Sequence, residues 1–253
     1  MGITPKEYIK RNKARKNKRN ILILGIFIIS IGSFALLKAE LFNIVEVIVE
    51  NNNILSKEEI LDETEVLGNN IFLIKLNELE DKILLNPYIE DVNIKRGIPN
   101  KISIKVSERV ASYKVIDDNK SYILNDNLVI MEKRDDLESI TLPILEGIEI
   151  EGRDLGESIT SNKEKIDFLK KLKVAYNNYS DMKIQSVDVS DINNMNIYLD
   201  NCKIILGDNE DVDKKLSKAI NILKSDKVNI EDGYIDISFN GNPIVYEGKN
   251  NKN

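Results

Sequence analysis

The segment RGIPNKISIKVSER, residues 96–109, decides how the first folded part of this 253-residue chain is built. From Ile102 to Val106 apolar and polar residues alternate, and a period of two predicts a strand with one buried face. Residues 96–100 contain glycine, proline and asparagine, which predicts a hairpin turn. Val92 and Ile94 alternate with polar residues in the same way and predict the strand before the turn.

A third strand and two helices are predicted upstream of this hairpin. Residues 44–50 read IVEVIVE, and such β-branched runs favour a strand, here with three valines on one face: Val45, Val47 and Val49. Ser56 and Glu59 form a capping box, which predicts a helix over about 57–66. Apolar residues at helical spacing predict a second helix over about 77–85. The order of elements is therefore βααββ, a small α+β domain.

An uncharged run, Ile21–Leu37, predicts a single transmembrane helix. Twelve of its 17 residues are Ile, Leu or Phe, and a helix of this length extends roughly 25 Å, at the short end of what crosses a bilayer. Residues 1–20 carry eight Lys or Arg and one acid, whereas the rest of the chain carries 28 basic and 41 acidic residues. Because positive residues stay in the cytoplasm, we expect a type II plasma-membrane protein with residues 38–253 outside.

The same features admit three other interpretations. The apolar run would fit the core of a large domain, but it lacks the polar stripe that core helices have. It would fit a cleaved signal peptide with a site near Ala39, but the basic leader and the apolar run are both long for one. The leader would fit a nucleic-acid-binding arm, but no aromatic or fold signal accompanies it. We therefore expect the basic leader and the apolar run to interact with the lipid bilayer, and we expect no nucleic-acid partner.

The second outer segment, residues 110–247, predicts a mixed α/β domain built on an antiparallel-rich sheet. Two helices are expected, over 163–176 and 214–223. Residues 142–147 predict a non-helical connector. Short β-branched or alternating runs predict strands at 112–116, 122–124, 129–131, 184–189, 195–199, 202–206, 234–239 and 243–246. Residues 248–253 are a short polar tail.

The composition argues against most catalytic chemistry. The chain has no His and one Cys, Cys202, which excludes a Ser-His-Asp triad, a Cys-His pair, a His-ligated zinc site and an intrachain disulfide. The acidic cluster Asp208–Asp213 lacks the glycine and the final glutamate of an EF-hand loop, and it precedes a helix, where carboxylates favour the positive end of the dipole. We therefore expect no catalytic, metal-binding or cofactor-binding residues and no enzyme activity.

Several strings in chain order resemble the FtsQ/DivIB family of bacterial cell division proteins. The opening from Phe42 to Ile60 and the hairpin R-x-x-P-N-x-x-x-I-x-V-x-E-R (Arg96–Arg109) are similar to that family's POTRA domain. Other matching pieces are Asn70–Phe72, Asn86–Ile89, Tyr122–Asn125, Leu142–Gly147, Ile205–Asp208 and Tyr234–Ile237. The resemblance implies a basic cytoplasmic tail at 1–20, a transmembrane helix at 21–37, a POTRA domain at 42–109 and the family's β domain at 110–247.

The resemblance implies a non-enzymatic scaffold of the divisome at the division septum. Its implied partners are FtsL, the DivIC/FtsB protein and the septal peptidoglycan synthase complex, and its implied output is control of septal peptidoglycan synthesis and septum formation. A partner strand is expected to add to the last strands of the β domain. The candidate partner-binding residues are Tyr234, Ile235, Asp236, Ile237, Ser238, Phe239, Ile244, Val245, Tyr246 and Glu247.

Two departures and three alternatives accompany this resemblance. Ser238 and Glu247 stand where some relatives have Arg and Trp, so side-chain pockets would differ while backbone pairing is kept. Taken singly, the candidate residues also fit ordinary strands of the domain core. A membrane-anchored cell-wall enzyme and a POTRA-type chaperone of exported proteins remain as alternative functions.

Overall fold

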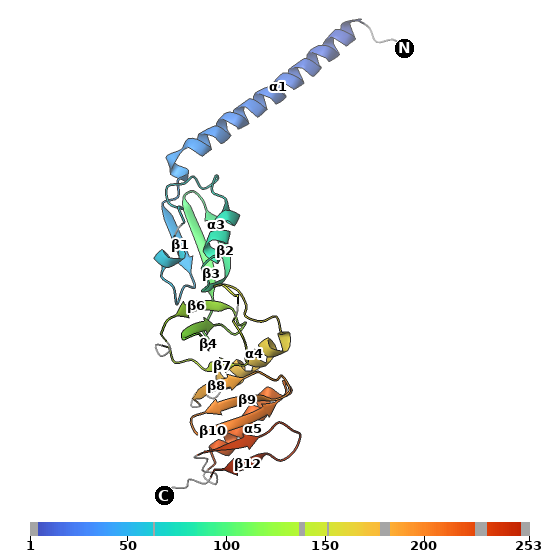
Figure 1. The fold of residues 1–253 in the computed structure, drawn as a ribbon. Coiled ribbons are helices and arrows are strands. Elements are labelled where there is room, and N and C mark those ends of the chain that lie inside the picture. Colours follow the sequence, from blue (N-terminus) through green and yellow to red (C-terminus); the bar gives the residue numbers. More distant parts are fainter. Residues whose placement is uncertain are drawn as a thin grey trace. The chain divides into compact units, whose positions relative to one another are not determined.

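The computed structural model describes residues 5–62, 64–136, 140–150, 152–177, 183–225 and 232–248 (Figure 1). These residues divide into two compact units. The first comprises Met1–Leu84 and Asp91–Ser107, and the second comprises Leu85–Glu90 and Glu108–Asn253.

Helix α1 (Pro5–Lys38) contains the predicted apolar run. In the described part of the chain it is the one helix that is long and apolar enough to cross a membrane, over Arg15–Ala35. The large apolar side chains from Ile21 to Phe34 are exposed, as they are in a helix whose solvent is lipid. The chain thus has the form of a single-pass membrane protein.

After α1, the first unit contains a three-stranded sheet and two helices in the predicted βααββ order. A 3-10 turn, η1 (Glu40–Phe42), leads into the sheet, whose strand order is β1-β3-β2. Strands β1 and β3 run parallel, with Val47 opposite Ile102 and Val49 opposite Ile104. Ile102 and Ile104 are fully buried, and burial of each such side chain stabilises the fold by about 1.5–3 kcal/mol. The elements are β1 (Glu46–Glu50), α2 (Lys57–Ile60), α3 (Leu76–Leu84), β2 (Ile89–Gly97) and β3 (Lys101–Glu108).

Two local predictions for this unit were wrong in detail. The capping box is present, since the Ser56 hydroxyl accepts from the Glu59 N–H at 3.2 Å, but α2 ends at Ile60 instead of about residue 66. The Thr64 hydroxyl donates to the Leu61 carbonyl at 2.6 Å, and such a side-chain bond competes with helical pairing. Val45 is exposed, because it precedes β1 and does not share the inward alternation of that strand.

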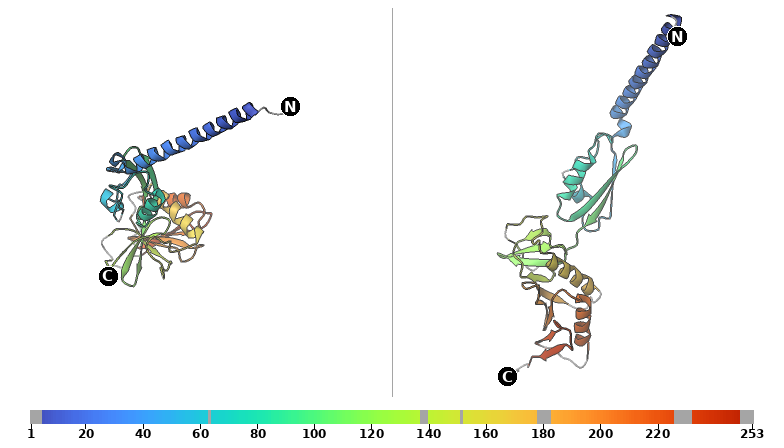
Figure 2. Two further views of the ribbon diagram at one scale, coloured as in Figure 1. Left: turned by 90° about the horizontal axis from the view of Figure 1, so that it is seen from above. Right: turned by 90° about the vertical axis from the view of Figure 1, so that its right-hand side faces the viewer.

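The second unit is a nine-stranded sheet with two helices, α4 (Lys163–Asn177) and α5 (Val212–Leu223), on one face (Figure 2). The strand order is β12-β11-β10-β9-β8-β7-β4-β5-β6. Five neighbouring pairs are antiparallel and three are parallel, as the prediction of an antiparallel-rich sheet requires. The strands are β4 (Tyr113–Asp117), β5 (Lys120–Leu124), β6 (Ile130–Arg134), β7 (Ile144–Glu146), β8 (Ile184–Asp188), β9 (Met195–Leu199), β10 (Cys202–Gly207), β11 (Gly233–Asp236) and β12 (Ile244–Glu247).

The core of this unit lies between the sheet and the two helices. Alternate residues of the central strands, among them Val187, Ile197 and Ile204, point toward the helices and are fully buried. Phe168 of α4 and Leu216 of α5 fill the same layer and are equally buried. The helices therefore cover one face of the strands and leave the other face half-exposed.

Candidate functional site

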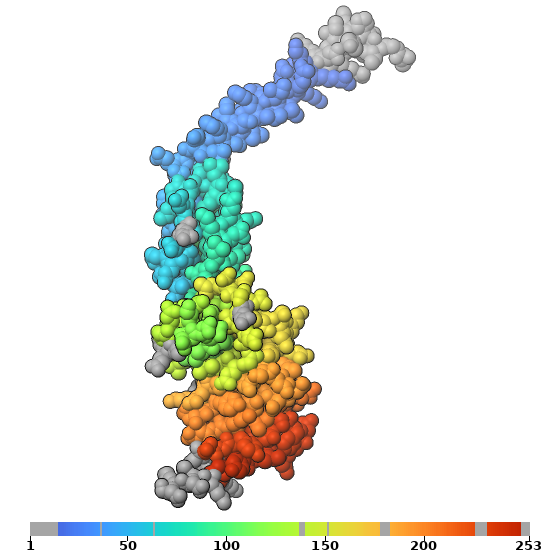
Figure 3. All heavy atoms as spheres, in the orientation of Figure 1, coloured from blue at the N-terminus to red at the C-terminus, as the bar shows by residue number. Residues whose placement is uncertain are grey.

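Strand β12 forms one edge of the nine-stranded sheet. It pairs antiparallel with β11, with Tyr234 opposite Tyr246 and Asp236 opposite Ile244. No other described strand pairs with its outer side. Every second residue of an edge strand directs its N–H and C=O groups outward, so β12 offers a free hydrogen-bonding row to a further strand. Figure 3 shows β11 and β12 (red) at the surface of the second unit.

The ten candidate residues divide between this edge and the core beneath it. Ile235 and Ile237 are buried, so they hold β11 in place and are not exposed to a partner. Ile244 and Tyr246 of β12 are about half exposed and border the open edge, whereas Phe239, also about half exposed, lies in the β11–β12 connection. The structure thus brings the candidate residues together as one hairpin with a buried support and an exposed apolar rim.

A ladder of aromatic and basic side chains crosses the half-exposed face next to this edge. Tyr198 of β9 lies opposite Lys203 of β10, Lys203 lies opposite Tyr234 of β11, and Tyr234 lies opposite Tyr246 of β12. The Lys203 ammonium is 5.4 Å from the centre of the Tyr198 ring, and the rings of Tyr234 and Tyr246 stack with centres 5.4 Å apart. Cross-strand aromatic pairs and cation–π contacts stabilise a sheet, and here the four directly opposite side chains share one face of it. Neither Tyr198 nor Lys203 was predicted from the sequence as a site residue.

The β11–β12 connection folds closely over the end of β10. The Ile237 N–H donates to the Ile205 carbonyl at 3.0 Å, which extends the contact between the two strands beyond Asp236. The Asp236 carboxylate accepts bonds from the Ser238 N–H and hydroxyl at 2.9 and 2.7 Å. Gly207 has a φ of +76°, and a Cβ at this residue would lie 2.8 Å from the Ser238 Cβ. A side chain at 207 therefore has no room.

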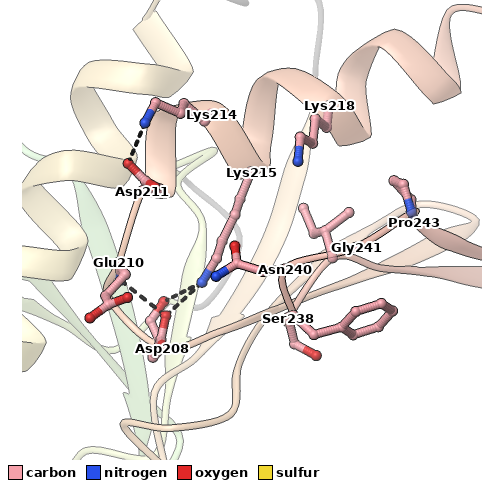
Figure 4. A pocket seen from close by; sticks show the side chains of 12 residues that line it. Asp208, Glu210, Asp211, Lys214, Lys215, Lys218, Ser238, Asn240, Gly241 and Pro243 are labelled. Carbon is pink, nitrogen blue, oxygen red and sulfur yellow. Dashed lines mark hydrogen bonds and ion pairs between the residues drawn. The ribbon is translucent and has the colours of Figure 1, made fainter.

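A pocket lined by both basic and acidic side chains lies between α5 and this connection, with a volume of about 100 Å³ (Figure 4). Three lysines of α5 line it: Lys214, Lys215 and Lys218. Lys215 donates to the Asp208 carboxylate at 2.6 Å and Lys214 donates to the Asp211 carboxylate at 2.8 Å. The hydrogen bond from Lys215 holds the pKa of Asp208 below its usual value.

This pairing accounts for the acidic cluster. Asp211 occupies the position before α5 but makes no capping hydrogen bond from its side chain, because its backbone is left-handed and its carboxylate contacts Lys214. The cluster therefore neutralises the lysines of the pocket. In the described residues no group of three or more His, Cys, Asp or Glu side chains could hold a metal ion.

The opposite edge of the sheet, β6, is built differently. Its first residue is hydrogen-bonded on the outer side by the segment 156–159, through Ile130 N–H to the Glu157 carbonyl and Gly156 N–H to the Ile130 carbonyl. The rest of the strand carries charges, and the Arg134 guanidinium donates to the Glu132 carboxylate at 2.6 Å. Charges and covering loops are the usual protections of an edge against pairing. The edge at β12 carries Ile244, Val245 and Tyr246, and its one charged residue is Glu247 at the end of the strand.

The Cys202 thiol is buried beneath the same hairpin. It lies opposite Gly233 in the parallel pair of β10 and β11, and burial raises its pKa to about 11. A thiolate is the reactive form of cysteine, so Cys202 acts as a small apolar residue of the core.

The fold defines a single-pass membrane protein with a small α+β domain followed by a large sheet with an open edge. Comparison with known proteins identifies both domains. The family model described as the POTRA domain, FtsQ-type, matches residues 42–109, and that described as cell division protein FtsQ/DivIB, C-terminal, matches residues 114–238. Strand β12 lies beyond the second match.

The chain belongs to the FtsQ/DivIB family of cell division proteins. It is 38% identical to the cell division protein DivIB of Clostridium tetani over 95% of this chain and 92% of that protein. It is 36% identical to DivIB of Clostridium botulinum strain Hall over 96% of this chain and 97% of that protein. A more distant relative is the cell division protein FtsQ of Syntrophotalea carbinolica, 25% identical over 48% of this chain and 44% of that protein.

Proposed function

We propose that this cell division protein is a non-enzymatic scaffold that captures a strand of a DivIC/FtsB-like protein at β12. The observation that carries the proposal is the contrast between the two sheet edges. The first residue of β6 is covered and the rest of that strand carries charges, whereas no described strand pairs with the outer side of β12, which Ile244 and Tyr246 border. β-Strand addition obtains affinity from backbone hydrogen bonds and specificity from alternate side chains, and β12 with its ladder supplies both.

The same proposal assigns the remaining partners and the location. FtsL and the septal peptidoglycan synthase complex are the further partners that the family resemblance implies, and control of septum formation is the output. The basic residues of 1–20 support a cytoplasmic N-terminus, with both folded units outside the plasma membrane at the division site. A scaffold without catalysis accords with a chain that has no His and whose single Cys is buried.

The test is capture of the DivIC/FtsB-like protein from membranes by the tagged full-length chain. The double variant Ile244→Lys/Tyr246→Lys places two charges on the exposed edge without filling or emptying the core, and edge lysines oppose strand addition. The control is Val174→Lys, since Val174 is an exposed apolar residue (66%) on α4 of the same unit. We expect capture to be lost in the double variant and kept in the control. Undiminished capture by the double variant would refute docking at β12.

A further inference from the structure

A buried side chain connects the C-terminal end of α1 to the part of the first unit that follows it. Helix α1 ends at Lys38, and the Asn70 amide donates to the carbonyl of Leu37 at 3.2 Å. The Oδ1 atom of the same Asn70 side chain accepts a hydrogen bond from the Phe72 N–H at 3.0 Å. The loop 67–74 is therefore held at the last turn of α1.

The turn between β2 and β3 lies at the same end. Strands β1 and β3 are parallel and start together, with Glu46 opposite Lys101. Just before them, the Val45 N–H donates to the Asn100 carbonyl at 3.0 Å. Three segments thus form this end: residues 39–45, the loop 67–74 and the turn 97–100. We call it the helix-proximal end.

The helix-proximal end has an unusual number of exposed apolar side chains. Six of them are between 40% and 68% exposed: Leu41, Val45, Leu67, Phe72, Leu73 and Ile98. The ring of Phe72 also contacts that of Phe42, with centres 5.2 Å apart. Single exposed apolar residues are normal, but a group gathered at one end of a small domain indicates a binding surface.

The length of the apolar run indicates what covers this surface. Ile21–Leu37 extends roughly 25 Å, about 5 Å less than the hydrocarbon core of a typical bilayer. Leu41 follows the last helical residue by three positions, so it lies within about 10 Å of the helix end along the chain. The exposed apolar side chains of the helix-proximal end therefore follow directly after the apolar run, which is too short to cross the hydrocarbon core alone.

We propose that the helix-proximal end is embedded in the interface of the bilayer that α1 crosses, on the leaflet where Lys38 emerges. Lipid is the occupant because the patch is continuous along the chain with the lipid-facing surface of α1. Lys38, at the end of α1, suits the headgroup layer, where a basic side chain keeps its charge in water. Lys101, at the start of β3, pairs with the Glu46 carboxylate at 2.5 Å. Arg96 donates to the carbonyl of Ile71 at 2.7 Å, which fixes the loop beneath the patch.

This inference does not depend on the partner strand at β12. It states that the first unit is held against the membrane instead of moving freely on a tether, since the short span draws the apolar end into the interface. The Glu40 carboxylate in the same segment then remains at headgroup level, in contact with water.

The chain has no tryptophan, so single tryptophans report on single sites. We would introduce Leu73→Trp and Ile98→Trp separately into the full-length chain, in vesicles of phosphatidylcholine and phosphatidylglycerol with or without brominated acyl chains. The matched control is Ile54→Trp, because Ile54 is about half exposed but follows the far end of β1. We expect the emission of both test variants to be blue-shifted and to fall severalfold with brominated lipid, while the control is unchanged.

Each other outcome overturns the proposal. Unquenched emission at either test site means that this side chain does not reach the acyl chains. A blue shift without quenching by bromine means that protein, either a second copy of the chain or another membrane protein, covers the surface instead of lipid. Equal quenching of the Ile54→Trp control means that the contact is not specific to the helix-proximal end.

Discussion

Replacement of Gly207 by alanine tests whether the β11–β12 connection is set by its close approach to the end of β10. The φ of +76° at this residue is left-handed, which costs a residue with a Cβ about 1–2 kcal/mol. The new Cβ would also lie 2.8 Å from the Cβ and 3.0 Å from the Cα of Ser238, and overpacking of this kind typically costs about 1–3 kcal/mol. The free energy of unfolding of the second unit should therefore fall by about 2–5 kcal/mol.

A second glycine separates the two contributions. Gly156 has a similar φ, +84°, but a Cβ there would meet nothing within 4 Å. Gly156→Ala should therefore cost only the backbone strain of about 1–2 kcal/mol. For both variants, urea unfolding of the full-length chain in detergent measures the free energy of unfolding. A separate assay measures capture of the DivIC/FtsB-like protein by each variant. Because residues 237–243 lead into β12, we expect Gly207→Ala to weaken capture and Gly156→Ala to leave it unchanged.

Equal destabilisation by the two alanines would refute this reasoning. It would mean that the chain near Ser238 moves away at no cost, so that the connection is not fixed by Gly207. Loss of capture in the Gly156 variant would refute it in another way, because that variant leaves the β11–β12 hairpin untouched.

Two further predictions concern titratable groups of the second unit. Since burial raises the pKa of Cys202 to about 11, Ellman's reagent at pH 8 should label the native full-length chain far more slowly than the urea-unfolded chain, and rapid native labelling would show that β10 and β11 open readily. Burial, and after it the hydrogen bond to the Glu132 carboxylate, raise the pKa of Tyr88 to about 12. The folded unit therefore holds this proton more tightly than the unfolded chain, whose tyrosine titrates near 10. The stability that this proton contributes is complete below about pH 10 and is lost as the pH rises toward 12. The urea midpoint should therefore fall more steeply over that range in the native chain than in Tyr88→Phe. Parallel slopes for the two proteins would contradict this assignment.

Elements with a clear period could be predicted from the sequence. The alternation from Ile102 to Val106 gave strand β3 with its buried face, and the helical spacing around Leu216 gave α5 with its inward side. The capping box of Ser56 and Glu59 located the start of α2 because its two hydrogen bonds lie within four residues. Such signals are local, so neighbouring residues suffice to determine them.

Elements that depend on distant partners could not be predicted in the same way. Strand β7 has three residues, Ile144–Glu146, and falls in the segment expected to be a non-helical connector. It is a strand because β4 and β8 lie on either side of it and supply its hydrogen bonds. No pattern within three residues carries that information.

The candidate site shows the same division. The last strands of the chain and their exposed apolar residues were found from the sequence and the family resemblance. The ladder was not, because Tyr198 and Tyr246 are 48 positions apart and meet only through the register of four strands. The pocket beside α5 was missed for a related reason, since its lysines lie on α5 and its far wall is the connection to β12.

The ladder also constrains any strand that adds to β12. Directly opposite residues on neighbouring strands share a face, so the row Tyr198–Lys203–Tyr234–Tyr246 continues into the residue that the new strand places opposite Tyr246. An aromatic or a basic side chain there extends the alternation of rings and ammonium, whereas an acidic residue next to Glu247 adds a like charge at the open edge. Backbone pairing alone would accept almost any extended segment, so under the proposed docking at β12 we expect the ladder to distinguish one partner strand from another.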